Sequence, residues 1–62
     1  MHIKEGQIWQ GFVEPSSELK CVTVLEVKVT PECTTAIIGY TDDEEIYFLA
    51  DYLFKNKFEY KV

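Results

Sequence analysis

The chain contains no arginine, and all six of its basic residues are lysines. Arginine is the side chain that most often holds phosphate or guanine through paired hydrogen bonds. Eleven acidic residues outnumber the lysines and give a net charge of −5. A negative field of this kind repels a nucleic-acid backbone. The composition therefore disfavours nucleic-acid binding. It suits either a protein partner with a basic surface or an acidic surface that only keeps the protein soluble.

Long apolar runs are also missing. No stretch reaches the roughly eighteen apolar residues of a membrane-spanning helix, and the first residues lack the basic segment and apolar run of a signal peptide. We therefore expect a cytoplasmic protein with no membrane association. The two cysteines, Cys21 and Cys33, should then be reduced and packed as small buried side chains. Whether a disulfide joins them stays open, because strand pairing could bring their Cα atoms within about 7 Å.

Signatures of catalysis are absent too. His2 stands alone near the start of the chain, with no partner pattern for a Cys–His dyad. The cysteines lack the C-x-x-C spacing of a zinc or redox site, and the acidic residues lack the spacing of a calcium loop. Without a coherent nucleophile, base or metal set, we expect a non-enzymatic protein that needs no cofactor.

The chain is short enough to form one domain, residues 1–62. A chain of this length buries only about 60% of its surface on folding. Aromatic residues make up 15% of the sequence, and each buried ring removes about 150–250 Å² from water. Aromatic packing should therefore offset the small size of the core.

Apolar periodicity predicts five short strands and one helical turn. Residues 6–13 form the first strand, where Gly11 suggests a bulge or a closely passing backbone. Residues 19–30 form the longest strand, with both faces apolar around its middle, as in a strand that bends between two sheets of a small barrel. In its second half, Leu25, Val27 and Val29 are expected to face inward.

The rest of the chain completes this pattern. After a turn at residues 31–32, residues 33–40 and 45–49 pair as a hairpin. Residues 50–56 change to helical spacing, and residues 58–62 alternate again. The sequence therefore predicts an all-β fold, a small five-stranded antiparallel SH3-like barrel with one short helical turn before the last strand.

Three segments resemble the small SH3-like β-barrel domains of bacteria and their phages: Gly6-Gln7-Ile8-Trp9, Val22-Thr23-Val24-Leu25-Glu26-Val27 and Phe48-Leu49-Ala50-Asp51-Tyr52-Leu53-Phe54. The resemblance covers nearly the whole chain as a pattern. It implies a binding function towards protein, peptide or nucleic acid, and it supplies no site residues. Nucleic-acid-binding versions differ from this chain, which lacks arginine and carries an acidic turn.

The acidic run lies at the predicted hairpin tip and comprises Asp42, Asp43, Glu44 and Glu45. One interpretation is a solvated tip that only adds solubility. The other is a docking site, because adjacent carboxylates raise the local potential and steer a basic partner.

Nine aromatic residues are too many for one small core. We expect Phe12, Phe48, Phe54 and Phe58 to pack inside, and Trp9, Tyr40, Tyr47 and Tyr52 to be exposed. Exposed aromatics beside an acidic rim match the anchors and rim of protein interfaces. The first hypothesis is therefore a protein-binding module, encoded by a phage or mobile element and modulating a host protein. The alternatives are a binder of single-stranded nucleic acid that stacks bases, and an assembly subunit acting as a homodimer or larger homo-oligomer.

Overall fold

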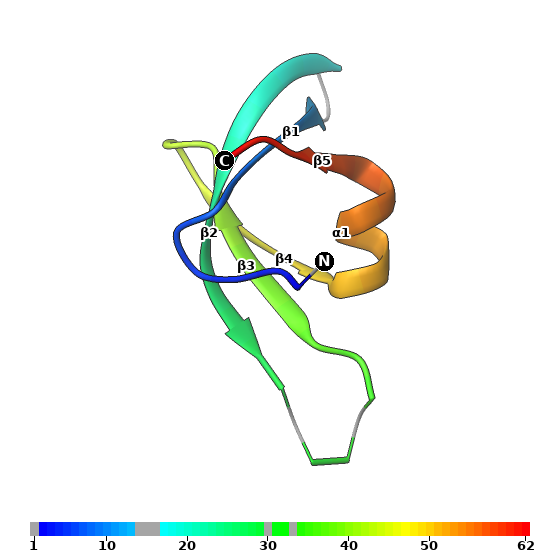
Figure 1. Ribbon diagram of the computed structural model, residues 1–62. Helices are drawn as coiled ribbons and strands as arrows, with labels where there is room; N and C mark the ends of the chain where they lie inside the picture. Colours follow the sequence, from blue (N-terminus) through cyan, green and yellow to red (C-terminus); the bar gives the residue numbers. More distant parts are fainter. Residues whose placement is uncertain (1, 14–16, 30, 33) are drawn as a thin grey trace.

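The computed structural model describes residues 2–13, 17–29, 31–32 and 34–62 of the chain (Figure 1). This part of the chain forms five strands and one helix: β1 (Ile8–Val13), β2 (Glu18–Lys28), β3 (Ile37–Thr41), β4 (Ile46–Ala50), α1 (Asp51–Lys57) and β5 (Phe58–Tyr60). The predicted fold class is confirmed, with a short helix before the last strand. At seven residues, α1 is too short to cross a bilayer, and the described ranges contain no other helix that could.

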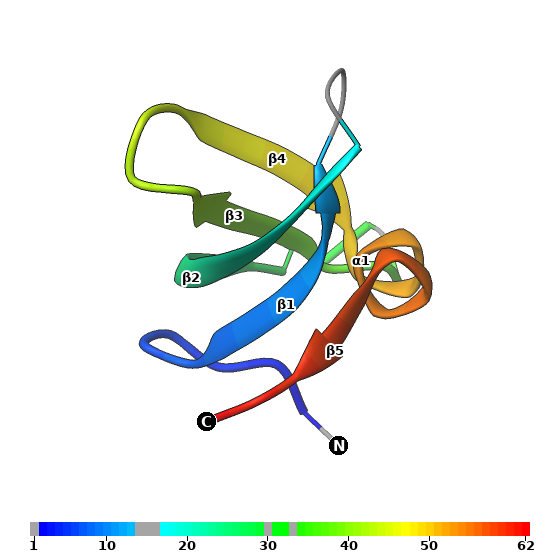
Figure 2. The same cartoon turned by 90° about the horizontal axis from the view of Figure 1, so that it is seen from above.

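All strand pairs are antiparallel, in the order β4-β3-β2-β1-β5. The first half of β2 pairs with β1 and its second half pairs with β3, so the sheet bends along β2. Strands β4 and β5 are the two edges, and α1 connects them (Figure 2). The fold is therefore a strongly bent sheet of barrel-like shape, and strand pairing does not close it into a complete barrel.

A β-bulge in β2 decides which side chains face the core. The register with β3 shifts between Val24 and Glu26, and the extra residue reverses the inward and outward alternation. Before the bulge Val22 and Val24 are buried, whereas after it Val27 packs against the core. The inward prediction is thus correct for Val27 and wrong for Leu25, which the bulge turns outward. It is also wrong for Val29, which lies beyond the end of β2 and is exposed.

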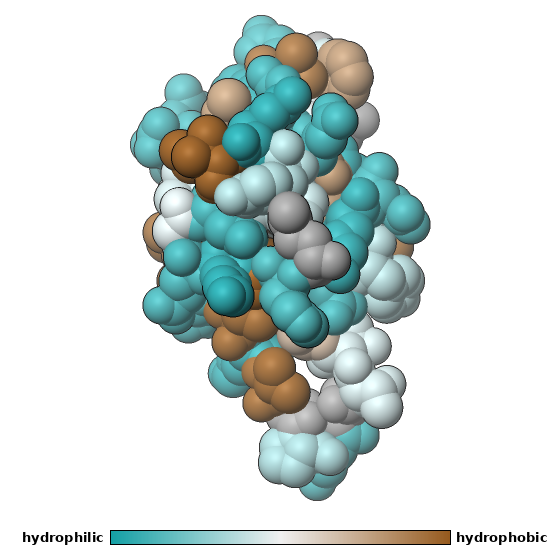
Figure 3. Space-filling view, in the orientation of Figure 1, coloured by the Kyte–Doolittle hydropathy of each residue, from teal (hydrophilic) through white to brown (hydrophobic). Residues whose placement is uncertain are grey.

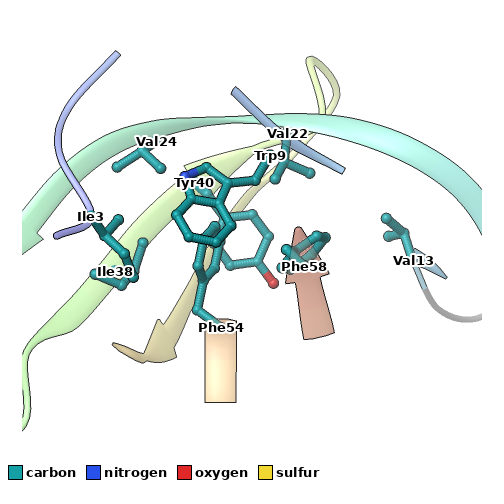
Figure 4. Packing of buried hydrophobic residues seen from close by; sticks show 9 residues of the cluster. All are labelled: Ile3, Trp9, Val13, Val22, Val24, Ile38, Tyr40, Phe54 and Phe58. Carbon is teal, nitrogen blue, oxygen red and sulfur yellow. The ribbon is translucent and has the colours of Figure 1, made fainter. Parts of the chain in front are cut away.

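Aromatic rings fill the interior between the two halves of the sheet (Figure 4). Phe54 of α1 is completely buried, and its ring centroid lies 5.1 Å from that of Trp9 and 5.1 Å from that of Tyr40. Both contacts are edge-to-face, a geometry worth about 0.5–1.5 kcal/mol beyond the buried area. The helix has no side-chain N-cap and is too short to be stable alone. Phe54 therefore anchors α1 to the sheet.

Gly11 is the point where the last strand meets the first. It pairs with Phe58, and a Cβ atom at this position would overlap the Lys57 carbonyl oxygen and lie 2.6 Å from Phe58 Cδ1. Of the two alternatives predicted for Gly11, a bulge or a closely passing backbone, the second is confirmed. Only glycine leaves room for β5 to lie beside β1.

Candidate binding surface

The acidic tip is a turn whose backbone is held by two side chains. Asp42 Oδ1 accepts hydrogen bonds from the N–H groups of Glu44 and Glu45, each at 3.0 Å. Thr41 Oγ1 donates to the Glu45 carbonyl at 2.8 Å and accepts from the Asp43 N–H at 3.1 Å. Asp43 has a φ of +78°, a conformation that aspartate tolerates better than most residues. The composition of the run therefore shapes the turn as well as charging it.

The second oxygen of Asp42 is also engaged. Oδ2 accepts a hydrogen bond from the Tyr47 hydroxyl at 3.3 Å and lies 3.9 Å from Lys20 Nζ, and the Asp42 side chain is only 3% exposed. The N–H groups of Glu45 and Glu44, followed by the Lys20 charge and the Tyr47 hydroxyl, lower the pKa of Asp42 below its ordinary 3.8. Asp42 is therefore ionised at neutral pH, and its charge is used within the protein.

Three of the four predicted acidic residues remain available to a partner. Asp43, Glu44 and Glu45 are all exposed. The acidic run was predicted as a solvated tip or a docking site, and Asp42 departs from both predictions because it turns inward to hold the turn. We call Asp43, Glu44 and Glu45 the acidic tip from here on.

Two of the predicted partner-binding aromatics lie in the core. Trp9 is 4% exposed and Tyr40 is 5% exposed, so the prediction that they are exposed is wrong. Both occupy inward positions, because Trp9 pairs with the buried Val22 and Tyr40 pairs with the buried Val24. Burial, followed by the nearby Asp42 charge, raises the pKa of Tyr40 above 10.0. Neither side chain is therefore part of the exposed surface.

The other two aromatics of the predicted set lie on different elements. Tyr47 is half-buried in β4, with its ring stacked on that of Tyr40 at a centroid distance of 5.4 Å. Desolvation, followed by the Asp42 charge, raises the pKa of Tyr47 above 10.0. Tyr52 lies on α1 and is 59% exposed, so its predicted exposure is confirmed. The four aromatics do not form one exposed patch.

Two phenylalanines expected in the core are exposed instead. Phe12 is 60% exposed and Phe48 is 63% exposed, whereas Phe54 and Phe58 are buried as predicted. Phe12 pairs with the exposed Leu19 across the outer face of β1 and β2. Phe48 pairs with Gly39, whose missing side chain leaves space for the ring. The position of an aromatic residue in its strand, and not its apolar character, therefore decides whether the ring is buried.

An apolar groove lies on the outer face of the sheet, and Phe48 is one of the residues that line it. It has a volume of about 230 Å³ and is lined by Leu25, Glu26, Gly39, Ile46 and Phe48; we call it the Phe48 groove. Ile46 is 61% exposed and follows directly on Glu45 of the acidic tip. Apolar side chains and carboxylates thus adjoin on one surface.

Sequence reasoning missed this groove, although a signal for it was present. Ile46 and Phe48 alternate with Tyr47 and Leu49, so one of the two pairs had to face outward. The turn fixes which pair does, because Asp42 binds the Tyr47 hydroxyl and so draws the Tyr47 side inward.

Other hydrophobic side chains are scattered over the surface. On the face shown in Figure 3 they form separate small patches among hydrophilic residues. Cys21 is exposed on the outer side of β2, which corrects its predicted burial. The outward turn follows from its pairing with Gln10. Cys33, and with it the question of a disulfide, lies outside the described residues.

A second hollow lies beside α1 and is lined in part by His2, Asp51 and Lys55. Its carboxylate already serves the backbone, since Asp51 Oδ1 accepts from the Tyr52 N–H at 2.7 Å and Oδ2 accepts from the Ala36 N–H at 3.5 Å. Among the residues described, no three His, Cys, Asp or Glu side chains gather closely enough to hold a metal ion. The Phe48 groove with the acidic tip therefore remains the surface best suited to a partner.

Comparison of the chain with protein-family models, with curated proteins and with solved structures found no match.

Proposed function

We propose that the protein is a non-enzymatic, acidic binding module whose partner is a protein that presents a basic and partly apolar surface. One observation carries this proposal. Ile46 and Phe48 are more than half exposed, Ile46 follows directly on Glu45 of the acidic tip, and the Glu26 carboxylate lines the same groove. Large apolar side chains that can be buried by a partner, within a polar rim, are the arrangement of protein interfaces.

The charge of the surface selects the partner. Glu26 and Ile46 line the groove, and the acidic tip directly precedes Ile46 in the chain. Lysine or arginine side chains of a partner would meet these carboxylates while its apolar side chains cover Phe48. Rim charges of this kind act mainly on the rate of encounter and on its salt dependence. Association should therefore slow as the ionic strength rises.

The biological setting follows from the resemblance to SH3-like barrel domains of bacteria and phages. A net charge of −5 suits a modulator encoded by a phage or mobile element, acting on a basic host protein in the cytoplasm. Charge and the pattern of the strands support this part of the proposal.

Capture from bacterial lysate tests the charge requirement. The tip variant combines Asp43→Asn, Glu44→Gln and Glu45→Gln, all at exposed positions. Its control is Glu59→Gln, an exposed acid of the edge strand β5. Proteins captured by the wild type should be lost with the tip variant and kept with the control. If every captured protein binds both variants equally, the acidic tip is not a docking site.

A further inference from the structure

Within the described residues, strand β4 has a free edge. It pairs with β3 on one side and is the last strand of the sheet on the other (Figure 2). An unpaired edge presents N–H and C=O groups that can pair with another extended chain. Only alternate residues of an edge strand direct these groups outward.

The hydrogen bonds between β3 and β4 identify these residues. Antiparallel pairs alternate between hydrogen-bonded and non-hydrogen-bonded. The Asp51 N–H donates to the Ala36 carbonyl at 2.9 Å, just beyond the pair of Ile37 and Ala50. The next bonded pairs in this register are Ile38 with Leu49 and Tyr40 with Tyr47. The N–H and C=O groups of Ile46 and Phe48 therefore point away from β3.

The free backbone groups and the exposed side chains belong to the same two residues. The side chains of Ile46 and Phe48 line the groove on the outer face, while their backbone groups face the open edge. A chain placed along this edge would gain hydrogen bonds from the backbone. Its side chains on the outer face would also cover Ile46 and Phe48.

This inference rests on the function proposed above. We propose that the partner contributes an extended segment that adds to β4 as a sixth strand. In this segment, lysine or arginine residues alternate with apolar residues. Addition of a strand to a sheet edge is a recurring mode of peptide recognition, in which the backbone gives affinity and alternate side chains give specificity. The acidic tip at the amino end of β4 attracts the basic side chains of this strand.

Charge favours this occupant over a second copy of the chain. Two copies paired through β4 would each bring a net charge of −5, and like charges oppose association.

The part of β4 that offers free backbone groups is also short. Ala50 is the N-cap of α1, and the carbonyl of an N-cap accepts the first hydrogen bond of its helix. By the alternation given above, the Ala50 N–H still points away from β3. Among the described residues, the free edge thus consists of the N–H and C=O groups of Ile46 and Phe48 together with the Ala50 N–H.

The opposite edge of the sheet lacks these features. Strand β5 is three residues long, with Phe58 buried in the core. Beyond it, the N–H groups of Lys61 and Val62 donate to the Ile8 carbonyl, so the chain stays bound to β1. Addition of a strand is therefore assigned to β4.

Synthetic peptides test the inference directly. The probes are capped heptapeptides with lysine at every odd position and valine, isoleucine, leucine or phenylalanine at the even positions. Each binding peptide is then made in two N-methylated forms, one methylated on the odd residues and one on the even residues. Only one edge of an added strand faces β4, so one form should bind at least about tenfold more weakly and the other should bind almost unchanged.

Amide hydrogen exchange supplies the second readout. On binding, the N–H groups of Ile46 and Phe48 should become protected, and Phe48→Ser should abolish binding while Phe12→Ser keeps it. Peptides with glutamate in place of lysine should not bind. Equal binding of both methylated forms, with no new protection, would overturn strand addition and leave the proposed function standing.

Two further outcomes also decide the matter. If no lysine peptide binds at low salt, strand addition by a basic segment is wrong, while the lysate capture experiment judges the proposed function separately. If light scattering shows a dimer and the Ile46 and Phe48 amides are protected without peptide, a second copy occupies the edge and the inference is overturned.

Discussion

The ring of Phe48 lies across Gly39 of the neighbouring strand, so that a Cβ atom on Gly39 would stand 3.1 Å from Phe48 Cε1. The same Cβ atom would stand 3.1 Å from Glu26 Cγ. Gly39 thus lets an aromatic ring of β4 and a carboxylate side chain of β2 approach each other over β3, which lies between these two strands. The shape of the groove depends on this missing side chain.

Gly39→Ala should therefore change binding more than stability. The neighbours of the new methyl group are flexible, partly exposed side chains that can shift by a few tenths of an ångström. Alanine also loses less backbone entropy than glycine on folding, by about 0.5–1 kcal/mol. We expect the free energy of unfolding to stay within about 1 kcal/mol of wild type, while partner capture falls as it does for Phe48→Ser. Urea unfolding and capture together measure this, and unchanged capture would mean that the ring position is unimportant.

Gly11→Ala should destabilise the fold strongly. Its methyl group would meet the Lys57 carbonyl oxygen, which is backbone and cannot rotate away, as well as the Phe58 ring. Overpacking of this kind costs about 1–3 kcal/mol, and we expect the upper end. Thermal melting followed by circular dichroism measures the loss. A melting temperature equal to that of the wild type would show that β5 does not lie as described.

Phe54→Ala should unfold much of the population at 25 °C. Phe54 is fully buried and contacts the rings of Trp9, Tyr40 and Phe58. Removing a buried phenylalanine costs about 3–5 kcal/mol, which approaches the whole stability of a small domain. Leu53→Ala, at an exposed position of the same helix, is the matched control and should stay folded. Equal stability of the two variants, measured by urea unfolding, would contradict the role of Phe54 as the anchor of α1.

Asp42→Asn should alter the response to acid. The folded-state pKa of Asp42 is lowered from 3.8. A lowered carboxyl pKa contributes stability that is present above the unfolded value and is lost as pH falls through the folded value. The melting temperature of the variant should therefore be lower than that of the wild type at neutral pH. The difference between the two melting temperatures should disappear as pH falls below about 3.8. Melting curves between pH 7 and pH 2 measure it. A gap that stays constant over this range would show that the Asp42 charge does not hold the turn.

The sequence predicted the elements better than their inward faces. The hairpin of β3 and β4 and the helix before the last strand were predictable from periodicity and residue type. At Gly11 the residue type left two alternatives, a bulge and a close approach of another backbone. A period of two identifies two sets of residues in a strand, but it does not say which set is buried when both carry large side chains. Strand β1 is such a case. Trp9 and Val13 belong to one set, and Ile8 and Phe12 belong to the other.

The prediction of the candidate site was partly wrong for the same physical reason. In β4 both sets, Ile46 with Phe48 and Tyr47 with Leu49, consist of large side chains with apolar bodies, and the hydrogen bond from Tyr47 to Asp42 distinguishes the inward set. The bulge near Leu25 reverses the alternation of β2 and places Leu25 in the groove. A bulge depends on how two strands pair, and therefore does not follow from one strand alone.

The central claim is tested most directly by comparing the proteins that the Phe48→Ser variant captures with those that the Phe12→Ser variant captures. Both residues are exposed phenylalanines of β-strands, at 63% and 60%, so the two variants remove the same apolar side chain at different places on the surface. Quantitative mass spectrometry of proteins captured from bacterial lysate should show partners retained by Phe12→Ser and lost by Phe48→Ser. Retention of the same partners by both variants, with both folded, would contradict a binding site at the Phe48 groove.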